Sequence, residues 1–499
     1  MLFIWAFVLA ISVNAQDPIV QQYGNKVSTD DLKEYLSIIA SDALEGRETG
    51  TRGQKMAAAF IAAHFQELGL TGPVNGSYYQ PVDLYSSAVA EAYLQAGQTK
   101  FDNYGGVVYY GTADSKGEAT IPVVFIGNAT EADFNQVDVK DKAVLLFTKE
   151  RLTGNKTIAL AREKGAKMVL ISNTDNVADF EILAGQMEGF LSGGRLSLEK
   201  PKEATNAGLF LVSPVVAEKI MGTTLEKLKK AAAEDPKKKA LKKIKPGAIS
   251  YKVAMASKIT KSENVLGYLE GTDKKDELVV ITAHYDHIGR RKGGDGDLIN
   301  NGADDDGSGT VSVMALAKAF AHAKNDGKGP RRSILFMTVT GEEKGLLGSE
   351  YYSEHPIFPL ESTVVDLNID MIGRRDPQHK DSAPYVYVIG SDKLSADLHT
   401  LSEATNKTYS NLLFDYTYND QNHPERLYYR SDHWNFAKKN IPIIFYFDGI
   451  HEDYHMPSDE VAKIEFDLLT KRAQCVFYTA WEIANREQRI RVDPEKRIK

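Results

Sequence analysis

Short apolar runs alternate with helical segments from Asn264 to the end of the chain. The runs lie at 278–281, 334–337, 364–369 and 443–447, and helical spacing follows at 310–323 and 464–483. Strands that are apolar along their whole length are buried on both faces, as in parallel sheets covered by helices. This pattern predicts an α/β fold, a three-layer sandwich with a mostly parallel mixed sheet in the middle.

The chain before Asn264 shows two other sequence patterns. Capping residues precede Leu32, and apolar residues at helical spacing predict two helices between residues 28 and 69. From about residue 104 to 250, β-branched runs alternate with Gly, Asp and Asn turns, which predicts a β-rich region. Because single cores rarely exceed ~300 residues, a chain of 499 residues is expected to form two or three domains.

Residues 1–15 are uncharged and mostly apolar, and they end in the small-residue step Val13-Asn14-Ala15. The pattern predicts a cleaved signal peptide, and its alternative is an uncleaved N-terminal anchor. We therefore expect a periplasmic or extracellular protein with no stable membrane insertion after cleavage. Cys475 is the single cysteine, so no disulfide can form within the chain.

The overall charge is acidic, with Lys+Arg 60 against Asp+Glu 68 and a formal net charge of −8. This balance argues against a nucleic-acid partner or a basic membrane-surface protein. A lysine-rich stretch at 227–245 is interpreted as a solvated helical face and is assigned no function.

Residues that bind metals follow several of the predicted strands. Five clusters carry them: His284-Tyr285-Asp286, Gly302 to Gly309, Gly341 to Gly345, Asn368-Ile369-Asp370, and Tyr454-His455. The carboxyl ends of strands in open α/β sheets are where ligand sites form. Any one cluster is a weak signal, but five at successive strand ends indicate one shared site.

The chemistry of these residues suits zinc. Two histidines and several carboxylates form a nitrogen and oxygen ligand set, and the excess of carboxylates indicates two metal ions that share the bridging ligand Asp305. Asp286 is expected to orient the His284 ring as a second-sphere carboxylate. Glu342 and Glu343 are adjacent, so one is expected to bind metal and the other to act as general base.

Other motifs are excluded. His451 to His455 is a literal H-E-x-x-H string, but it lies before Pro457 with no helical period, so only His455 is kept as a ligand. Asp295-Gly296-Asp297 resembles the start of a calcium loop, but Ile299 stands where an oxygen ligand is needed. The chain has no G-x-S-x-G, Walker or G-x-G-x-x-G motif.

The five clusters together resemble the co-catalytic dizinc aminopeptidases, a family that also contains glutamate carboxypeptidases, transferrin-receptor-like proteins and glutaminyl cyclases. The segments that carry the resemblance follow the family's order: Ala283 to His287, Gly302 to Gly309, Gly341 to Ser349, Asn368 to Gly373, and Tyr454 to Asp459. The opening segment Ser41 to Arg47 matches as well. Val137 to Leu146 resembles part of a protease-associated domain.

The resemblance implies a zinc exopeptidase fold and a role for each site residue. His284 and Asp370 would hold one zinc ion, Glu343 and His455 the other, and Asp305 would bridge them. Glu342 would be the general base, and Tyr454 would donate its hydroxyl to the oxyanion. Arg430-Ser431-Asp432-His433 is interpreted as architectural.

The resemblance also divides the chain. Residues 16–103 and 251–499 would form the zinc peptidase domain, with 104–250 as a protease-associated insert. The expected function is an aminopeptidase with peptide substrates and two zinc ions as cofactors. The alternatives are a carboxypeptidase, a glutaminyl cyclase or a non-catalytic, receptor-like binding protein. The preferred side chain and the oligomeric state are left open.

Overall fold

A computed structural model describes residues 16–149, 152, 155–191, 194–201, 208–233 and 240–498. The predicted signal peptide at 1–15 lies outside the described residues. The chain divides into two compact units, one made of Met1–Asp83 with Lys261–Lys499 and the other of Leu84–Thr260. The second unit therefore begins earlier and ends later than the predicted insert at 104–250. The reason is that the two long strands β1 (Tyr79–Ala96) and β8 (Gly247–Leu269) each run across a boundary between the units.

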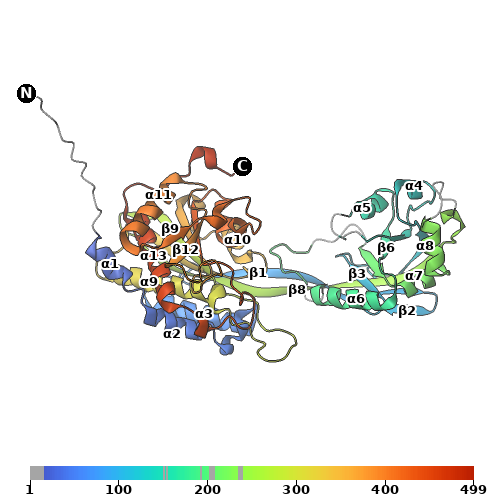
Figure 1. Cartoon of the computed structure of the whole chain (residues 1–499), viewed down its shortest axis with the longest axis horizontal. Coiled ribbons are helices and arrows are strands. Elements are labelled where there is room, and N and C mark those ends of the chain that lie inside the picture. Colours follow the sequence, from blue (N-terminus) through green and yellow to red (C-terminus); the bar gives the residue numbers. More distant parts are fainter. Residues whose placement is uncertain are drawn as a thin grey trace, which may run out of the picture. The chain divides into compact units, whose positions relative to one another are not determined.

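A mixed, mostly parallel sheet forms the centre of the first unit (Figure 1). The strand order is β13-β12-β14-β11-β9-β10-β8. The pairs β9–β10, β9–β11, β11–β14 and β12–β13 are parallel, whereas β12–β14 and β8–β10 are antiparallel. The bounds are β9 (Lys274–His284), β10 (Arg332–Val339), β11 (Thr363–Ile369), β12 (Tyr385–Ile389), β13 (Leu413–Asp415) and β14 (Ile443–Phe447).

Helices cover both faces of this sheet. The helices α1, α2, α3, α9, α11 and α13 share one apolar core with it, while α10 and α12 pack into a second core on the other face. Their bounds are α1 (Pro18–Gly24), α2 (Thr29–Ile39), α3 (Arg52–Glu67), α9 (Gly309–Asn325), α10 (Leu347–Glu354), α11 (Ala396–Thr405), α12 (His433–Ala437) and α13 (Phe466–Asn485). The predicted three-layer α/β sandwich is confirmed.

The sequence patterns at the helix ends explain where the first helices lie. Ser28 is the N-cap of α2, and its hydroxyl accepts a hydrogen bond from the Asp31 N–H at 3.2 Å. Gly69 follows α3 with a φ of 74°, a conformation that glycine adopts without steric cost. Both predicted N-terminal helices are present.

The second unit also contains a sheet between helices. Its order is β8-β4-β5-β6-β7-β3, and β1 pairs with β2 and β8. Helices α7 and α8 pack on one face and α4, α5 and α6 on the other. The bounds are β2 (Thr99–Asp102), β3 (Val107–Tyr110), β4 (Ala119–Phe125), β5 (Ala143–Phe147), β6 (Met168–Ser172), β7 (Leu209–Val212), α4 (Glu131–Phe134), α5 (Lys156–Glu163), α6 (Val177–Leu191), α7 (Pro214–Met221) and α8 (Leu225–Ala233). Its identification as a protease-associated domain stays a prediction.

One feature of the surface was also predicted. In α8, Leu225 and Leu228 face the core while Lys227 and Lys229 are exposed, so the described part of the lysine-rich stretch is a solvated helical face. Among the described residues, no helix has both the length and the apolar character that crossing a membrane requires.

Candidate metal centre

The predicted site residues meet at the carboxyl ends of neighbouring parallel strands. His284 is the last residue of β9 and pairs in register with Val339 at the end of β10. Glu342 and Glu343 follow β10, Asp370 follows β11, and His455 lies on the loop after β14. The aligned register of these strands is therefore what brings residues far apart in the sequence to one place.

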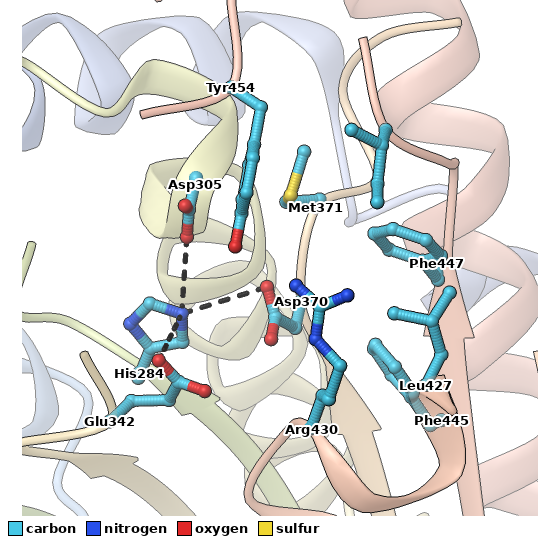
Figure 2. A pocket seen from close by; sticks show the side chains of 11 residues that line it. His284, Asp305, Glu342, Asp370, Met371, Leu427, Arg430, Phe445, Phe447 and Tyr454 are labelled. Carbon is cyan, nitrogen blue, oxygen red and sulfur yellow. Dashed lines mark ion pairs between the residues drawn. The ribbon is translucent and has the colours of Figure 1, made fainter. Parts of the chain in front are cut away.

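Asp305 lies between two groups of side chains and offers one oxygen to each. Its Oδ1 is 3.3 Å from His284 Nε2, while its Oδ2 is 3.0 Å from His455 Nε2. On the first side, Asp370 Oδ1 is 3.6 Å from the same His284 nitrogen (Figure 2). On the second side, Glu343 Oε2 is 3.2 Å from His455 Nε2. The five expected ligands thus converge around one carboxylate.

The donor set fits two divalent ions. Asp305 Oδ2 and Glu343 Oε1 are buried and form no well-directed hydrogen bond with a described residue; their polar neighbours are the ring nitrogens of His455 at 3.0 Å and His287 at 2.8 Å. Buried polar atoms in native proteins are nearly always paired, so atoms of this kind indicate a partner such as an ion. Histidine nitrogens and carboxylate oxygens without cysteine are ligands that suit zinc.

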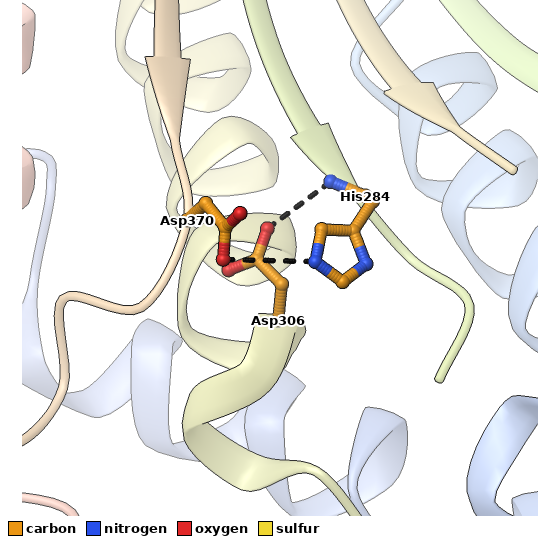
Figure 3. A group of neighbouring side chains, drawn as sticks. All are labelled: His284, Asp306 and Asp370. Carbon is orange, nitrogen blue, oxygen red and sulfur yellow. Dashed lines mark hydrogen bonds and ion pairs between the residues drawn. The ribbon is translucent and has the colours of Figure 1, made fainter. Parts of the chain in front are cut away.

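Asp306 also lies beside His284 and Asp370, but its oxygens are already used (Figure 3). Its Oδ2 accepts a hydrogen bond from the His284 backbone N–H at 3.1 Å, and its Oδ1 accepts from the N–H groups of Gly309 and Met371 at 2.9 and 3.2 Å. Asp306 therefore joins the ends of β9 and β11 to the start of α9, and we do not count it as a ligand.

The backbone that carries Asp305 is held by Asp459. The Asp459 carboxylate accepts hydrogen bonds from the N–H groups of both Asp304 and Asp305 at 3.0–3.1 Å. The Asp304 side chain has a separate partner, because Asp304 Oδ2 lies 3.1 Å from His451 Nε2. His451 is the first histidine of the H-E-x-x-H string, which forms turns and no helix, so setting that motif aside is confirmed.

A buried arginine from the N-terminal segment ties the site loops together. The Arg47 side chain is fully buried and donates hydrogen bonds to four carbonyl groups. Its acceptors are Tyr285 O at 2.9 Å, Ile39 O at 3.1 Å, Gly302 O at 3.0 Å and Asn301 O. Two of these carbonyls precede Asp305 and one follows His284, so Arg47 fixes both ligand-bearing loops.

Replacing Arg47 with methionine should destabilise the first unit. Methionine keeps an unbranched aliphatic side chain, but four buried carbonyl groups lose their hydrogen-bond donor. This loss should lower the free energy of unfolding by about 3 kcal/mol or more. Trp434 and Trp481 both lie in the first unit, so their fluorescence in urea reports its unfolding. Arg52→Met, at a side chain that is 73% exposed, is the matched control. Coincident midpoints for the two variants would show that Arg47 has no such role.

The contact between Asp286 and His284 differs from the predicted one. The hydrogen-bond acceptor for His284 Nδ1 is the main-chain carbonyl of Asp286 at 3.1 Å, and the carboxylate lies 3.9 Å away. The carboxylate instead accepts hydrogen bonds from the Thr49 hydroxyl at 2.6 Å and from the Glu342 N–H at 3.3 Å. Asp286 thus orients the imidazole through its backbone, while its side chain positions Glu342.

Glu342 and Tyr454 border the space next to His284. Glu342 Oε2 is 3.9 Å from His284 Nε2, and burial, with Glu343 and Asp370 nearby, raises the pKa of Glu342. The Tyr454 ring stacks on His455, and its hydroxyl points into the space between Asp305 and Asp370 in Figure 2. Burial and the carboxylates of Asp305 and Glu343 raise the pKa of Tyr454.

The segment 430–433 contributes to the site, although it was interpreted as architectural. Ser431 donates a hydrogen bond from its hydroxyl to Asp370 Oδ2 at 2.6 Å, which leaves Oδ1 facing His284. Arg430 extends its guanidinium into the pocket in Figure 2 and pairs with Glu425 at 3.0 Å. Asp432 and His433 are buried and bonded to Ser349 and to the Tyr428 carbonyl, as an architectural role requires.

The pocket beside the ligands has an apolar wall. The side chains that form it are Met371, Leu427, Phe445, Phe447 and Ile450. The metal-ligand side of the pocket carries His284, Asp305, Glu342 and Asp370. A small apolar group could therefore enter next to the candidate metal positions.

Comparisons with known proteins agree with this fold. Residues 264–480 match the profile of peptidase family M28. Aminopeptidase YwaD of Bacillus subtilis strain 168 is 25% identical over 461 residues, which cover 90% of this chain and 84% of that protein. The structure of an aminopeptidase from Aneurinibacillus sp. strain AM-1 aligns with a TM-score of 0.54 at 18% identity, over 95% and 98% of the two chains. BSAP, a zinc aminopeptidase from Bacillus subtilis, aligns with a TM-score of 0.50 at 18% identity, over 92% and 96%.

The fold and the site define a metallopeptidase, in which a three-layer sandwich gathers histidines and carboxylates at the ends of parallel strands. Residues 264–480, the part of the chain that matches peptidase family M28, hold every ligand-type residue of the site.

Proposed function

We propose that the chain is a secreted or periplasmic dizinc aminopeptidase. The observation that carries the proposal is the position of Asp305, whose two oxygens face two separate groups of ligand atoms. In this assignment His284 and Asp370 hold one zinc ion and Glu343 and His455 hold the other. Bound zinc would lower the pKa of a water molecule and polarise the scissile carbonyl.

The protein's own residues supply the proton transfers and the orientation. Glu342 is the general base, because its carboxylate lies beside the ligands and it is not one of the five. It takes a proton from the attacking water and delivers it to the leaving amine. Tyr454 donates its hydroxyl to the oxyanion, and Asp286 holds the Glu342 backbone in place.

Three arguments favour the N-terminal reaction and secretion. The aminopeptidases YwaD and BSAP are similar to this chain over most of its length. The ligand set is complete, which argues against a receptor-like protein that has lost its metals. Secretion is inferred from the leader pattern of residues 1–15.

One feature favours a carboxypeptidase as the second candidate. The Arg430 guanidinium lies in the pocket, and an arginine can bind a carboxylate with two hydrogen bonds. A free C-terminus would supply such a carboxylate, whereas an aminopeptidase needs only a free N-terminus.

A peptide pool with blocked ends separates the two candidates. The zinc-loaded protein is incubated with peptides that are free at both ends, acetylated at the N-terminus or amidated at the C-terminus, and the products are identified by mass spectrometry. An aminopeptidase shortens the free and the amidated peptides from the N-terminus and leaves the acetylated ones intact. A carboxypeptidase shortens the free and the acetylated peptides, which would contradict the proposal. Loss of ammonia from N-terminal glutamine would indicate a cyclase.

A further inference from the structure

A short hairpin leaves the site after β9 and returns to it before α9. It spans residues 289–300, and Arg290 forms an antiparallel bridge with Ile299. The Arg291 N–H donates a hydrogen bond to the Leu298 carbonyl at 2.9 Å, which continues the pairing by one step. The tip beyond these pairs is rich in glycine. The hairpin therefore has a paired stem, on which side chains take fixed directions.

The base of the hairpin is tied to the backbone that surrounds the site. The Gly289 N–H donates to the Gly46 carbonyl at 3.0 Å. Asn300 donates to the Gly289 carbonyl twice, from its backbone N–H at 3.0 Å and from its side-chain amide at 2.8 Å. Gly46 precedes Arg47, the arginine that fixes the ligand-bearing loops. Hydrogen bonds therefore set the position of the stem relative to the candidate metal ligands.

The hairpin carries three consecutive cations, Arg290, Arg291 and Lys292, in a chain whose net charge is −8. All three side chains are exposed, and none forms an ion pair with a described residue. Successive side chains of an extended segment point to opposite faces. Arg291 therefore points to one face of the hairpin, and its two basic neighbours point to the other.

Arg291 lies against the loop that carries His455. Its Nη2 is 3.1 Å from Met456 Sδ and 3.5 Å from the His455 carbonyl oxygen. A thioether is a weak hydrogen-bond acceptor, and 3.5 Å is longer than an ordinary N–H···O bond. Most of the donor capacity of the guanidinium is therefore unused. A guanidinium in this state binds a carboxylate well, because the two planar groups can form a pair of hydrogen bonds.

The two sides of the metal centre show where a bound peptide would run. The apolar pocket lies on the side of His284 and Asp370, and neither Glu343 nor His455 lines it. Among the five assigned ligands His455 has the most exposed side chain, at 35%, compared with 12% for Asp370. If the N-terminal side chain occupies the apolar pocket, the residue after the scissile bond leaves on the His455 side, beside Arg291.

We propose that Arg291 binds a carboxylate on the substrate residue that follows the scissile bond. The inference rests on the proposed aminopeptidase function and names the class of peptide that this function prefers. The carboxylate has two sources, the side chain of an aspartate or glutamate and the free C-terminus of a dipeptide. Both present the same planar group to the guanidinium. Arg291 is then a residue that determines specificity and takes no part in the proton transfers.

Four leucyl substrates test the proposal on the zinc-loaded protein. Leucyl-alanine carries the carboxylate at its C-terminus, and leucyl-glutamate α-amide carries it in the side chain. Leucyl-alanine amide and leucyl-glutamine amide are their neutral counterparts. Release of leucine gives kcat and KM for each substrate. We expect KM to be at least about ten-fold lower for a carboxylate substrate than for its neutral counterpart. A preference in one pair alone identifies the source of the carboxylate.

Variants of the hairpin show which side chain causes the preference. Arg291→Gln should bring the ratio of the two KM values to about one, because glutamine has no charge to pair with the carboxylate. Arg291→Lys keeps the charge and should retain part of the preference. Arg290→Gln is the matched control, since this arginine is also exposed and points to the other face, and it should keep the wild-type ratio.

Two results would overturn the proposal. One is an unchanged KM ratio in Arg291→Gln. The other is an equal loss of activity on all four substrates in that variant, which would mean that Arg291 only supports the loop that carries His455.

The inference and the proposed function fail in different ways. If the wild type releases leucine from all four substrates with equal KM, the aminopeptidase reaction stands and Arg291 does not select the substrate. If the wild type cleaves leucyl-alanine and leaves the three amides intact, the enzyme needs a free C-terminus. The proposed reaction is then wrong, and the inference about Arg291 is wrong with it.

Discussion

Replacing Glu342 with glutamine is expected to lower kcat for peptide hydrolysis about 1000-fold while both zinc ions stay bound. Glutamine keeps the size of the side chain and cannot take a proton from the attacking water. Its neighbour Asp286 accepts a hydrogen bond from the backbone N–H of residue 342, so the substitution leaves that contact in place. We therefore attribute the expected loss of activity to the missing proton transfer.

Steady-state kinetics on a free peptide and zinc analysis of the same preparation test this expectation together. Glu343→Gln is the matched comparison, because the adjacent residue is assigned to metal binding and should lose zinc as well as activity. If Glu342→Gln keeps activity within ten-fold of the wild type, Glu342 is not the general base. Loss of zinc from Glu342→Gln would mean that this carboxylate is itself a ligand.

Replacing Asp305 with asparagine is expected to remove both zinc ions and to lower the activity at least about 1000-fold. Its two oxygens face different ligand groups, at 3.3 Å from His284 and 3.0 Å from His455. The amide has one oxygen and no negative charge, so it cannot bridge two cations. A ligand that belongs to both positions should therefore have the largest single effect on metal content.

Asp306→Asn is the comparison for this experiment, and zinc per protein is the measurement. The Asp306 oxygens accept three backbone hydrogen bonds, so that variant should be less stable and still bind two zinc ions. If Asp306→Asn loses zinc while Asp305→Asn keeps it, the ligand assignment of the two residues has to be exchanged.

Much of the first unit could be predicted because its strands are buried on both faces. Continuous apolar runs at β9, β10, β11 and β14 indicated a covered parallel sheet, and the register of such a sheet brings its polar strand ends together. The strands β12 and β13 were not predicted. β13 has only three residues and none of them is buried, whereas β12 is a buried five-residue run that the sequence analysis missed.

The unit boundaries were harder to predict for a different reason. No Gly-, Pro- or Ser-rich linker marks residue 84 or 260, because strands β1 and β8 continue through both positions. A change in the pattern of apolar and turn residues shows where short helices and strands begin. It does not show which compact unit a long strand belongs to.

The site residues that sequence reasoning missed act through backbone atoms or distant partners. Arg47 binds carbonyl groups, and Asp459 binds backbone N–H groups about 150 residues earlier in the sequence. Both residues end segments that carry the family resemblance, Ser41 to Arg47 and Tyr454 to Asp459, but neither was assigned a role. His287, whose Nδ1 lies 2.8 Å from Glu343 Oε1, stands in the same strand-end segment as His284 and Asp286, but the five-ligand assignment left it without a role.

The discontinuity of the first unit has a consequence for folding. Arg47 must reach Tyr285, 238 residues later in the sequence and beyond the whole of Leu84–Thr260, and closing such a loop costs about 5 kcal/mol of chain entropy. If the second unit folds first, the pairing of β1 with β8 joins its two ends, shortens the loop that remains to be closed and lowers this cost. The rate at which the metal centre forms then depends on the stability of a unit that supplies none of its ligands.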